Sequence, residues 1–383
     1  MILTKGQEEA IKACTERYRN REPFTVIAGP AGSGKSSVIP YIIESLNISE
    51  DEVAFAALTG KAARVLREKG CENAMTLHKL LYIPKKIKDT DDVEFIPREY
   101  LENNPKLIVV DESSMVSQEI FNLLLSHKVH IIFLGDNFQL PAIGDNAHIL
   151  DNPHVVLTEI TRQALDSPII RLSMDIREGK PLTYGGEKEA KIIPRKNVSS
   201  KLLLGADITL CGKNNTRRWL NTEIRKLKWG DKFQSNPLEG DKLICLKNYY
   251  KHVDETGEEP LLNGSIGTIS KLHTQDTKLL KPKLTAEFID DLGNVFKKGT
   301  FNIDYQLLTT GVPTVNNDNF RDFYKVQRPL EFDYGYCVTC HKFEGSQADK
   351  VLVFAEQMGD KEYFYKWTYT AATRAVKQVV IIL

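Results

Sequence analysis

A glycine-rich segment near the N-terminus constrains the fold more than any other part of the sequence. Residues 29–36 read Gly-Pro-Ala-Gly-Ser-Gly-Lys-Ser, which fits the pattern G-x-x-x-x-G-K-[ST] and follows an apolar run at residues 24–28. This arrangement is typical of a phosphate-binding loop between a strand and a helix. Its glycines allow successive backbone N–H groups to point at one anion where the helix begins. The sequence therefore predicts an α/β domain with a phosphate site at this turn.

The loop also predicts which residues would hold a nucleoside triphosphate and its metal ion. Lys35 is expected to reach the β- and γ-phosphates, and the hydroxyl of Ser36 to hold Mg²⁺. The alternative is a glycine-rich turn that binds nothing, which the flanking strand and helix disfavour. The residues expected around the nucleotide are Gly29, Ala31, Gly32, Ser33, Gly34, Lys35, Ser36 and Ser37.

Two acidic residues follow a second apolar run. Residues 107–110 are apolar throughout, as in a buried parallel strand, and lead to Asp111 and Glu112. Carboxylates at the carboxyl end of such a strand face the crevice where ligands bind. Asp111 is therefore expected to hold Mg²⁺ and Glu112 to polarise the attacking water, unless the pair only caps a helix. Gln139 follows another apolar run and is expected to sense the γ-phosphate.

Length and composition limit the class of protein. The chain has 383 residues, enough for two or three domains. Lys plus Arg and Asp plus Glu both number 51, so a surface for nucleic acid must be local. Six scattered cysteines predict reduced thiols, and the Cys-x-x-Cys-His at residues 337–341 lacks the export signal or second cysteine pair expected of haem or zinc sites. No apolar run reaches the length of a membrane span, so we expect a cytoplasmic protein.

Strands and helices alternate through the first part of the chain, which predicts a mostly parallel sheet covered on both faces. Pro40 predicts a kink or an early end in the helix expected over residues 34–45. Residues 82–104 read as a protruding insertion, either a hairpin or a solvated loop. Short strands separated by turns from residue 240 to about 295 predict a small β-barrel inserted into a second α/β region. Trp219 is expected in the core rather than as a stacking platform for bases.

Taken together, these segments resemble the superfamily 1 helicases of the 5′-to-3′ branch, which includes RecD-like and phage Dda-like enzymes. The resemblance spans nearly the whole chain and implies an α/β fold with two RecA-like parallel-sheet motor domains. It implies a motor domain 1A at residues 1–165 with a pin insertion 1B at about 82–104, a motor domain 2A at 166–239 and 330–383, and an SH3-like insertion 2B at 240–329. The implied cofactors are ATP and Mg²⁺.

The resemblance also implies roles for single residues. Gln7 stands where the family has its adenine-reading glutamine, and Gly345 is expected beside the nucleotide. Arg162 and Arg374 stand where the family projects arginines towards the γ-phosphate. Residues 339–347 resemble the family motif Thr-x-His-Lys-x-Gln-Gly-Ser but carry Glu344 in place of its Gln, which leaves the contact of that position open.

The implied partners are single-stranded DNA and forked or tailed duplex DNA, with replication or recombination proteins as further candidates. The host compartment would be the bacterial or phage-infected cytosol. One chain carries every motor part, so a monomer would suffice. Phe95 is a hypothetical wedge at the pin, with an anchor of the hairpin base as its alternative. The residues expected to contact DNA are Thr59, Lys61, His78, Phe95, Thr339, His341 and Lys342.

The expected function is ATP-dependent DNA unwinding with 5′-to-3′ movement. The first alternative is an ATP-switched clamp or loading factor on single-stranded DNA, which would need neither Arg162 nor Arg374. The second alternative is a small-molecule kinase, which accounts for the phosphate loop but not for the motifs at residues 339–345 and 369–374.

Overall fold

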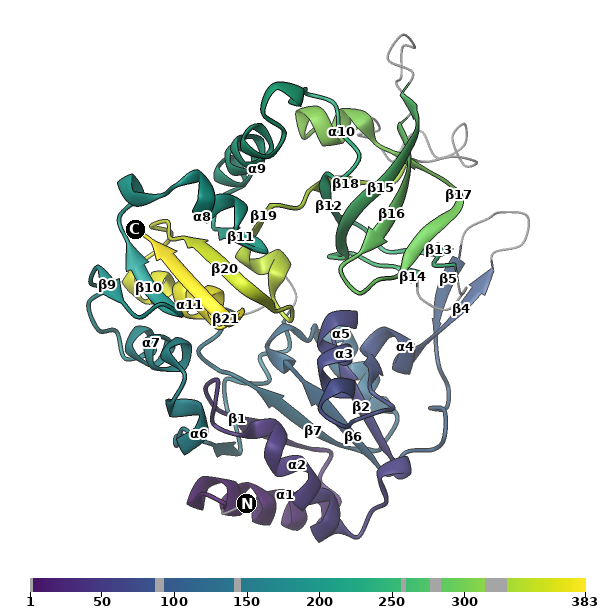
Figure 1. The fold of residues 1–383 in the computed structure, drawn as a ribbon. Coiled ribbons are helices and arrows are strands. Elements are labelled where there is room, and N and C mark those ends of the chain that lie inside the picture. The colour runs from purple at the N-terminus through teal and green to yellow at the C-terminus, as the bar shows by residue number, and fades with distance from the viewer. Residues whose placement is uncertain (1–2, 87–92, 141–145, 256–259, 276–283, 314–328) are drawn as a thin grey trace. The chain divides into compact units, whose positions relative to one another are not determined.

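The computed structural model describes residues 3–86, 93–140, 146–255, 260–275, 284–313 and 329–383 (Figure 1). The chain divides into two compact units, which are described in turn. Unit 1 comprises Met1–Ile83, Ile96–Val198 and Phe343–Leu383, and unit 2 comprises Pro84–Phe95 and Ser199–Lys342. The domain boundaries expected from the sequence remain predictions.

A six-stranded sheet forms the base of unit 1, and all its strands are parallel. The order is β3-β2-β6-β7-β1-β8, with neighbours far apart in sequence, as crossover helices require. This confirms the predicted parallel sheet. The strands are β1 (Phe24–Ala28), β2 (Val53–Ala57), β3 (Met75–Thr76), β6 (Leu107–Asp111), β7 (His130–Gly135) and β8 (Val155–Val156).

Helices cover both faces of this sheet, because alternate side chains of each strand enter different apolar clusters. Ile27 joins the cluster on one face, while Val26 and Ala28 join the cluster on the other. The first face is covered by α1 (Lys5–Arg19), α2 (Lys35–Leu46) and α3 (Gly60–Glu68), and the second by α4 (Leu77–Leu81) and α5 (Gln118–Ser126). Burial on both faces explains why these strands read as continuous apolar runs.

The expected early end of α2 is wrong, because the helix includes Pro40 and continues to Leu46. Proline removes one backbone donor from a helix interior. Four apolar side chains of α2 are buried around that position, and their packing outweighs the lost hydrogen bond. They are Val38, Ile39, Ile42 and Ile43.

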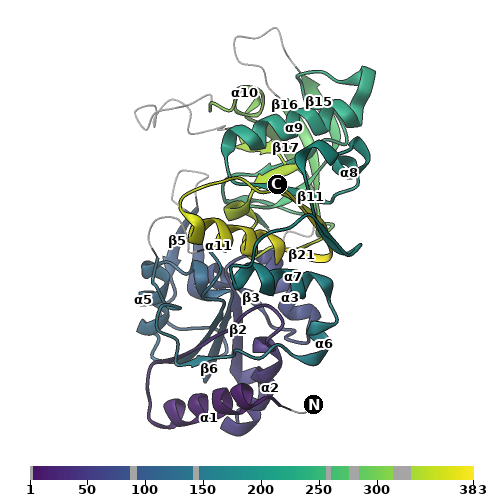
Figure 2. The ribbon, with the colours of Figure 1, turned by 90° about the vertical axis from the view of Figure 1, so that its left-hand side faces the viewer.

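Unit 1 also contains strands and helices from later in the chain. β10 (Ala190–Ile193) and β20 (Ala348–Phe354) pair parallel with the two edges of β21 (Ala375–Ile382), and β9 (Gly185–Gly186) pairs antiparallel with β10. α7 (Pro168–Arg177) and α11 (Lys361–Ala372) pack on each other and on β21, as Figures 1 and 2 both show. The short helix α6 (Arg162–Leu165) precedes α7.

The insertion predicted at residues 82–104 contains two paired strands. β4 (Tyr82–Lys86) and β5 (Val93–Pro97) form a two-stranded sheet, so this segment is a hairpin rather than a loop alone. The residues that join the two strands lie outside the described part of the chain. The role of the hairpin as a pin remains a prediction.

The longer segment of unit 2 starts with α8 (Ser200–Leu204) and contains a parallel pair of strands, β11 (Ile208–Cys211) and β19 (Cys337–Thr339). The side chain of Asn221 on α9 (Asn214–Trp229) both donates to and accepts from the backbone of Cys337, at 2.9 and 2.8 Å. Trp219 is 55% exposed, so its expected place in the core is wrong. The reason is helical periodicity, because the buried face of α9 consists of Arg217, Leu220, Asn221, Ile224 and Arg225.

The remainder of unit 2 is rich in strands, as the sequence predicts. A five-stranded antiparallel sheet has the order β17-β16-β15-β12-β18, and β13 pairs with β14. Its likeness to an SH3 module remains an expectation. The elements are β12 (Lys242–Cys245), β13 (Tyr249–Val253), β14 (Pro260–Leu261), β15 (Ile266–Gln275), β16 (Leu284–Asp290), β17 (Val295–Ile303), α10 (Tyr305–Thr310) and β18 (Phe332–Tyr334).

Two further properties concern the chain as a whole. Among the described residues, none of the helices is both long enough and apolar enough to cross a membrane. All six cysteines carry free thiols.

A buried ion pair ties α9 to the antiparallel sheet of unit 2. Asp241, which is 0% exposed, accepts from Arg225 Nε at 3.1 Å and from Arg225 Nη2 at 2.9 Å. The same carboxylate accepts from the indole of Trp229 and the hydroxyl of Tyr336, each at 2.8 Å. The guanidinium of Arg225 lies 4.0 Å from the ring centroid of Tyr334. Removing the carboxylate would leave a buried charge without its counter-ion.

We therefore predict that Asp241→Ala lowers the free energy of unfolding by about 3–5 kcal/mol, the usual cost of breaking a buried ion pair from one side. Urea denaturation followed by circular dichroism measures this loss. Glu223→Ala is the matched control, because its ion pair with Lys226 on the same helix is solvent-exposed and is expected to contribute less than about 1 kcal/mol. Equal losses in the two variants would contradict the assigned role of Asp241.

Candidate active site

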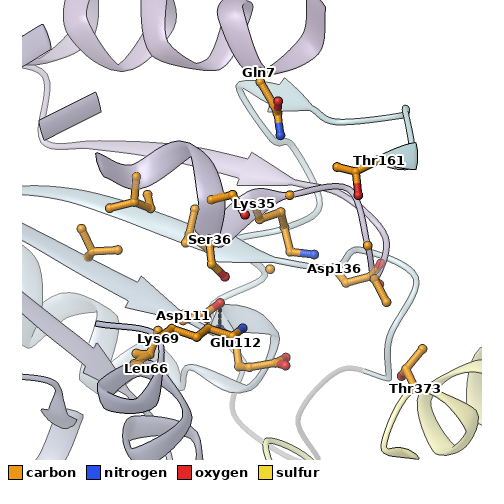
Figure 3. A pocket seen from close by; sticks show the side chains of 18 of the residues that line it. Gln7, Lys35, Ser36, Leu66, Lys69, Asp111, Glu112, Asp136, Thr161 and Thr373 are labelled. Carbon is orange, nitrogen blue, oxygen red and sulfur yellow. Dashed lines mark hydrogen bonds between the residues drawn. The ribbon is translucent and has the colours of Figure 1, made fainter. Parts of the chain in front are cut away.

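A cavity of about 1400 Å³ lies in unit 1 where β1, β6 and β7 end (Figure 3). It is lined by segments far apart in the sequence, from α1 to the turn after α11. The structure thus brings most of the sequence-predicted nucleotide residues to one place. Those that line the cavity are Gln7, Ala31, Gly32, Gly34, Lys35, Ser36, Ser37, Asp111, Glu112, Gln139 and Arg374.

The phosphate loop has the backbone conformation that its glycines permit. Gly32 and Gly34 adopt left-handed φ angles of +81° and +78°. A Cβ atom on Gly34 would collide with the side-chain amide of Gln7, which donates to the carbonyl of Ser33 at 3.4 Å. Gly29 and Ser33 do not line the cavity but hold the loop, since Gly29 N–H donates to Gly135 and Ser33 Oγ donates to Pro30.

Lys35 lies across the loop that it follows. Its ammonium donates to the carbonyl oxygens of Gly29 at 2.7 Å and Pro30 at 3.0 Å. Carbonyl oxygens carry only partial negative charge, so an ionised phosphate oxygen is the stronger partner for this ammonium. The position of Lys35 therefore suits the binding of an anion in the loop.

The carboxylates of Asp111 and Glu112 lie next to each other at the end of β6. Asp111 Oδ1 accepts from the N–H of Glu112 at 2.9 Å, and Glu112 has a left-handed φ of +53°. Burial and the adjacent charge of Glu112 raise the pKa of Asp111, while Lys35 and Lys69 oppose this rise. Figure 3 shows Lys35, Ser36 and Asp111 around the same open space.

This donor set fits Mg²⁺. A divalent cation would offset both the burial of Asp111 and its repulsion by Glu112, and Mg²⁺ prefers carboxylate and hydroxyl oxygens. No group of three or more His, Cys, Asp or Glu side chains arranged for a metal occurs in the part of the chain that the structure describes. The ion would thus be held by Ser36 and Asp111 together with phosphate oxygens, as is usual for Mg²⁺ at nucleotide sites.

Three predicted catalytic residues form a contact chain beside the carboxylates. With its amide oriented so that both ends are paired, Gln139 donates to Glu112 Oε2 at 3.2 Å and accepts from Arg374 Nη2 at 3.0 Å. Arg374 is 2% exposed, and its Nη1 lies 3.8 Å from Glu112 Oε1. The guanidinium thus lies beside the carboxylate that the sequence predicts as the base.

Glu344 lies near this contact chain and is nearly buried, at 5% exposure. Neither of its carboxylate oxygens has a hydrogen-bond partner among the described residues. Burial raises the pKa of Glu344 to about 8, with a smaller opposing effect of Arg374 and a further rise from Glu112. The departure from the family's Gln therefore places an acid that favours its neutral form beside Arg374.

Two other residues that the sequence predicts near the nucleotide, Arg162 and Gly345, are not among the described residues that line the cavity. Arg162 begins α6, and its side chain lies outside the described part of the structure. Gly345 does not line the cavity. Its carbonyl instead accepts from the hydroxyl of Thr59 at 3.1 Å, because its left-handed φ of +67° turns the backbone towards α3.

The residues predicted to bind DNA fall into both units. In unit 1, Thr59 caps α3, Lys61 lies 5.3 Å from the ring of Phe343, and His78 stacks on Tyr82 at 5.6 Å. Burial lowers the pKa of His78, which favours its neutral form. The other predicted DNA contacts, in unit 2, are Phe95 on β5, Thr339 at the end of β19, and His341 and Lys342 just after it. Burial also lowers the pKa values of His341 and Lys342.

Sequence reasoning missed the contacts among Asp136, Arg177 and Tyr369, of which Asp136 lines the cavity. Tyr369 and Asp136 lie within segments that the sequence singled out, so a search for buried polar partners in those segments would have found them. Arg177 lies in an amphipathic helix, and no signal in the sequence distinguishes it.

The burial of Glu344 predicts a pH-dependent stability. In the unfolded chain Glu344 loses its proton near the usual glutamate pKa of 4.5, whereas in the folded state it keeps the proton up to about pH 8. The free energy of unfolding therefore falls as pH rises from 4.5 to about 8. Glu344→Gln keeps the shape and removes the charge. Relative to the wild type, we expect this variant to gain on the order of 3 kcal/mol between pH 5 and pH 8. Urea denaturation at several pH values tests this, and parallel pH profiles of the two proteins would refute it.

Comparisons with known proteins show which families the chain resembles. Residues 2–192 match the family described as AAA domain, and residues 334–382 match the UvrD-like helicase C-terminal domain. The ATP-dependent RecD2 DNA helicase of Deinococcus radiodurans is 31% identical over 92% of this chain and 46% of its own length. The ATP-dependent DNA helicase dda of Enterobacteria phage T4 is 30% identical over 46% of this chain and 43% of its own length. The chain thus spans less than half the length of these relatives.

The fold has solved counterparts as well. The structure of a Pif1 helicase from Bacteroides in complex with ADP-AlF3 and single-stranded DNA superposes with a TM-score of 0.53 at 18% identity, covering 100% of this chain and 92% of that one. The chain therefore has a Pif1-like helicase fold. With the matched family descriptions and relatives, this shows that the chain belongs to the superfamily 1 helicases, in the 5′-to-3′ branch of RecD-like and Dda-like proteins.

Proposed function

We propose that this protein is an ATP-dependent DNA helicase that moves 5′-to-3′ along single-stranded DNA. The observation that carries the proposal is the contact chain of Glu112, Gln139 and Arg374 beside the phosphate loop. A base, an amide and a guanidinium in contact are the groups needed to activate water and to stabilise charge on a transferring phosphoryl group.

Each residue has a defined part in the proposed hydrolysis. The loop N–H groups and Lys35 bind the phosphates, and Gln7 lies where the base would enter. When bound by Ser36 and Asp111, Mg²⁺ supplies positive charge to the phosphate oxygens. Glu112 accepts a proton from the attacking water, and Gln139 orients that water. Arg374 stabilises the charge of the transition state, an effect worth about 10³–10⁵ in rate for arginine fingers.

The proposed DNA contacts lie close to these groups within unit 1. Thr59 and Lys61 contact Gly345 and Phe343, which flank Glu344 in the late motif. A DNA strand bound at Thr59 and Lys61 would thus be linked to Arg374 through residues 343–345. The Bacteroides Pif1 structure contains single-stranded DNA, which supports the proposed partner. His78, Thr339, His341 and Lys342 are proposed as further contacts with the strand.

The first test concerns ATP hydrolysis. We expect Glu112→Gln to lower the DNA-stimulated turnover number by about 10²-fold or more, because it removes the base. Lys35→Ala is expected to lower kcat/KM at least about tenfold, because it removes a phosphate contact. Phosphate release with and without a short single-stranded DNA measures both.

Lys12→Ala is the matched control, since this exposed lysine of α1 pairs with the exposed Glu16 and does not line the cavity. Unchanged turnover in both active-site variants, with folding intact, would refute the proposal. Hydrolysis that proceeds without strand displacement would favour the ATP-switched clamp instead.

The second test concerns direction and the hairpin. We expect the wild type to separate duplexes with a 5′ tail and not those with a 3′ tail. Phe95→Ala is expected to slow this unwinding at least about threefold while leaving DNA-stimulated hydrolysis unchanged, because a wedge acts on the duplex and not on the nucleotide. Unwinding of 3′-tailed duplexes alone would contradict the direction, and full-speed unwinding by the variant would contradict the wedge.

A further inference from the structure

A tyrosine hydroxyl on α11 joins two loops of the proposed active site. Tyr369 is 0% exposed, and its hydroxyl accepts from the N–H of Ala31 at 3.1 Å and lies 2.5 Å from Asp136 Oδ2. A backbone N–H is only a donor and a phenol has one proton, so the hydroxyl must donate that proton to Asp136. Burial and the charge of Asp136 raise the pKa of Tyr369 far above its usual value, so the proton stays on the hydroxyl.

Asp136 in turn fixes the start of the loop that carries Gln139. Its Oδ1 accepts from Arg177 Nη1 at 2.6 Å and from the N–H of Phe138 at 3.0 Å. Asp136 is 2% exposed, so these hydrogen bonds are shielded from water, where each is electrostatically stronger than in solvent. The orientation of the loop therefore depends on where Asp136 is held.

Both neighbours of Gln139 are attached to α11. On one side, the ring of Phe138 packs edge-to-face on Tyr369, with centroids 5.2 Å apart. On the other side, the N–H of Leu140 donates to Thr370 Oγ1 at 3.0 Å. Because the residues before and after Gln139 are fixed on the same helix, the position of its amide follows that helix.

The same hydroxyl reaches the phosphate loop through Ala31, which lines the cavity. Through this hydrogen bond α11 contacts the phosphate loop, and α11 leads directly into Arg374. One side chain thus connects the loop expected to bind phosphates with the loop expected to orient water.

We propose that Tyr369 is a positioning residue for ATP hydrolysis, whose hydroxyl sets the distance between the phosphate loop at Ala31 and the amide of Gln139. The role rests on the proposed function. It concerns the transition state more than ground-state binding, because misplacing a water-orienting amide slows the reaction while leaving most phosphate contacts in place.

Tyr369→Phe isolates the hydroxyl, because the ring contacts with Phe138 and with the guanidinium of Arg177 remain. We expect the turnover number with single-stranded DNA to fall about tenfold or more, while the KM for ATP changes less than about threefold. Steady-state phosphate release at several ATP concentrations separates the two constants.

Tyr365→Phe is the matched control. Tyr365 lies one turn earlier on α11, is 9% exposed, and donates to the carbonyl of Lys180 at 2.9 Å, away from the cavity lining. We expect its turnover number to stay within about twofold of the wild type. A similar loss of turnover in both variants would show that any lost hydroxyl of α11 has this effect, and would overturn the proposal.

A second measurement avoids catalysis as the readout. Binding of ADP alone to Tyr369→Phe is expected to match the wild type within about threefold, whereas binding of ADP with aluminium fluoride and single-stranded DNA weakens about as much as turnover falls. Equal weakening of both, or unchanged turnover, would overturn the positioning role. A wild type that hydrolyses no ATP would overturn the proposed function itself and this role with it, so the two failures are distinguishable.

Discussion

The active site depends on the parallel register of three neighbouring strands. Ala28 of β1 pairs with Gly135 of β7, and Val110 of β6 pairs with Phe133 of β7, so all three strands end at one edge of the sheet. The phosphate loop follows β1, the acidic pair ends β6, and Asp136 follows β7. Groups from three separate parts of the sequence meet because parallel strands present their carboxyl ends on the same side. Every further contact at the cavity builds on this alignment.

Charge balance decides what the site can hold. Asp111, Glu112 and Glu344 are acids in or near one cluster, and Lys35, Lys69 and Arg374 are the cations that act on them. The family's Gln at position 344 would leave two acids and three cations. The glutamate found here avoids a third negative charge only by keeping its proton, which its burial favours. The charge at the proposed nucleotide site therefore depends on pH in a way that a neutral amide would not allow.

The sequence predicted those parts of the site that local patterns encode. The phosphate loop, the acidic pair after an apolar strand and Gln139 after another strand are each readable from a few neighbouring residues. Features that depend on packing between distant segments were not predictable in this way. Trp219 was misplaced because one residue's shift around a helix moves a side chain from core to solvent. An early end of α2 at Pro40 was wrong because burial of the neighbouring side chains outweighs a lost donor. The ion pair of Arg177 and Asp136 joins segments about 40 residues apart, and neither residue carries a pattern of its own.

Three consecutive residues, 343–345, connect the proposed DNA contacts on α3 with the proposed catalytic residue Arg374. Phe343 lies against the ammonium of Lys61, Gly345 accepts from Thr59, and Glu344 between them lies beside Arg374. Adjacent residues share a backbone, so a change in how α3 holds the outer two displaces the middle one. In a close-packed interior such a displacement is passed to the neighbouring side chains rather than absorbed. Binding at Thr59 and Lys61 would therefore alter the surroundings of Arg374 through the consecutive residues Phe343, Glu344 and Gly345.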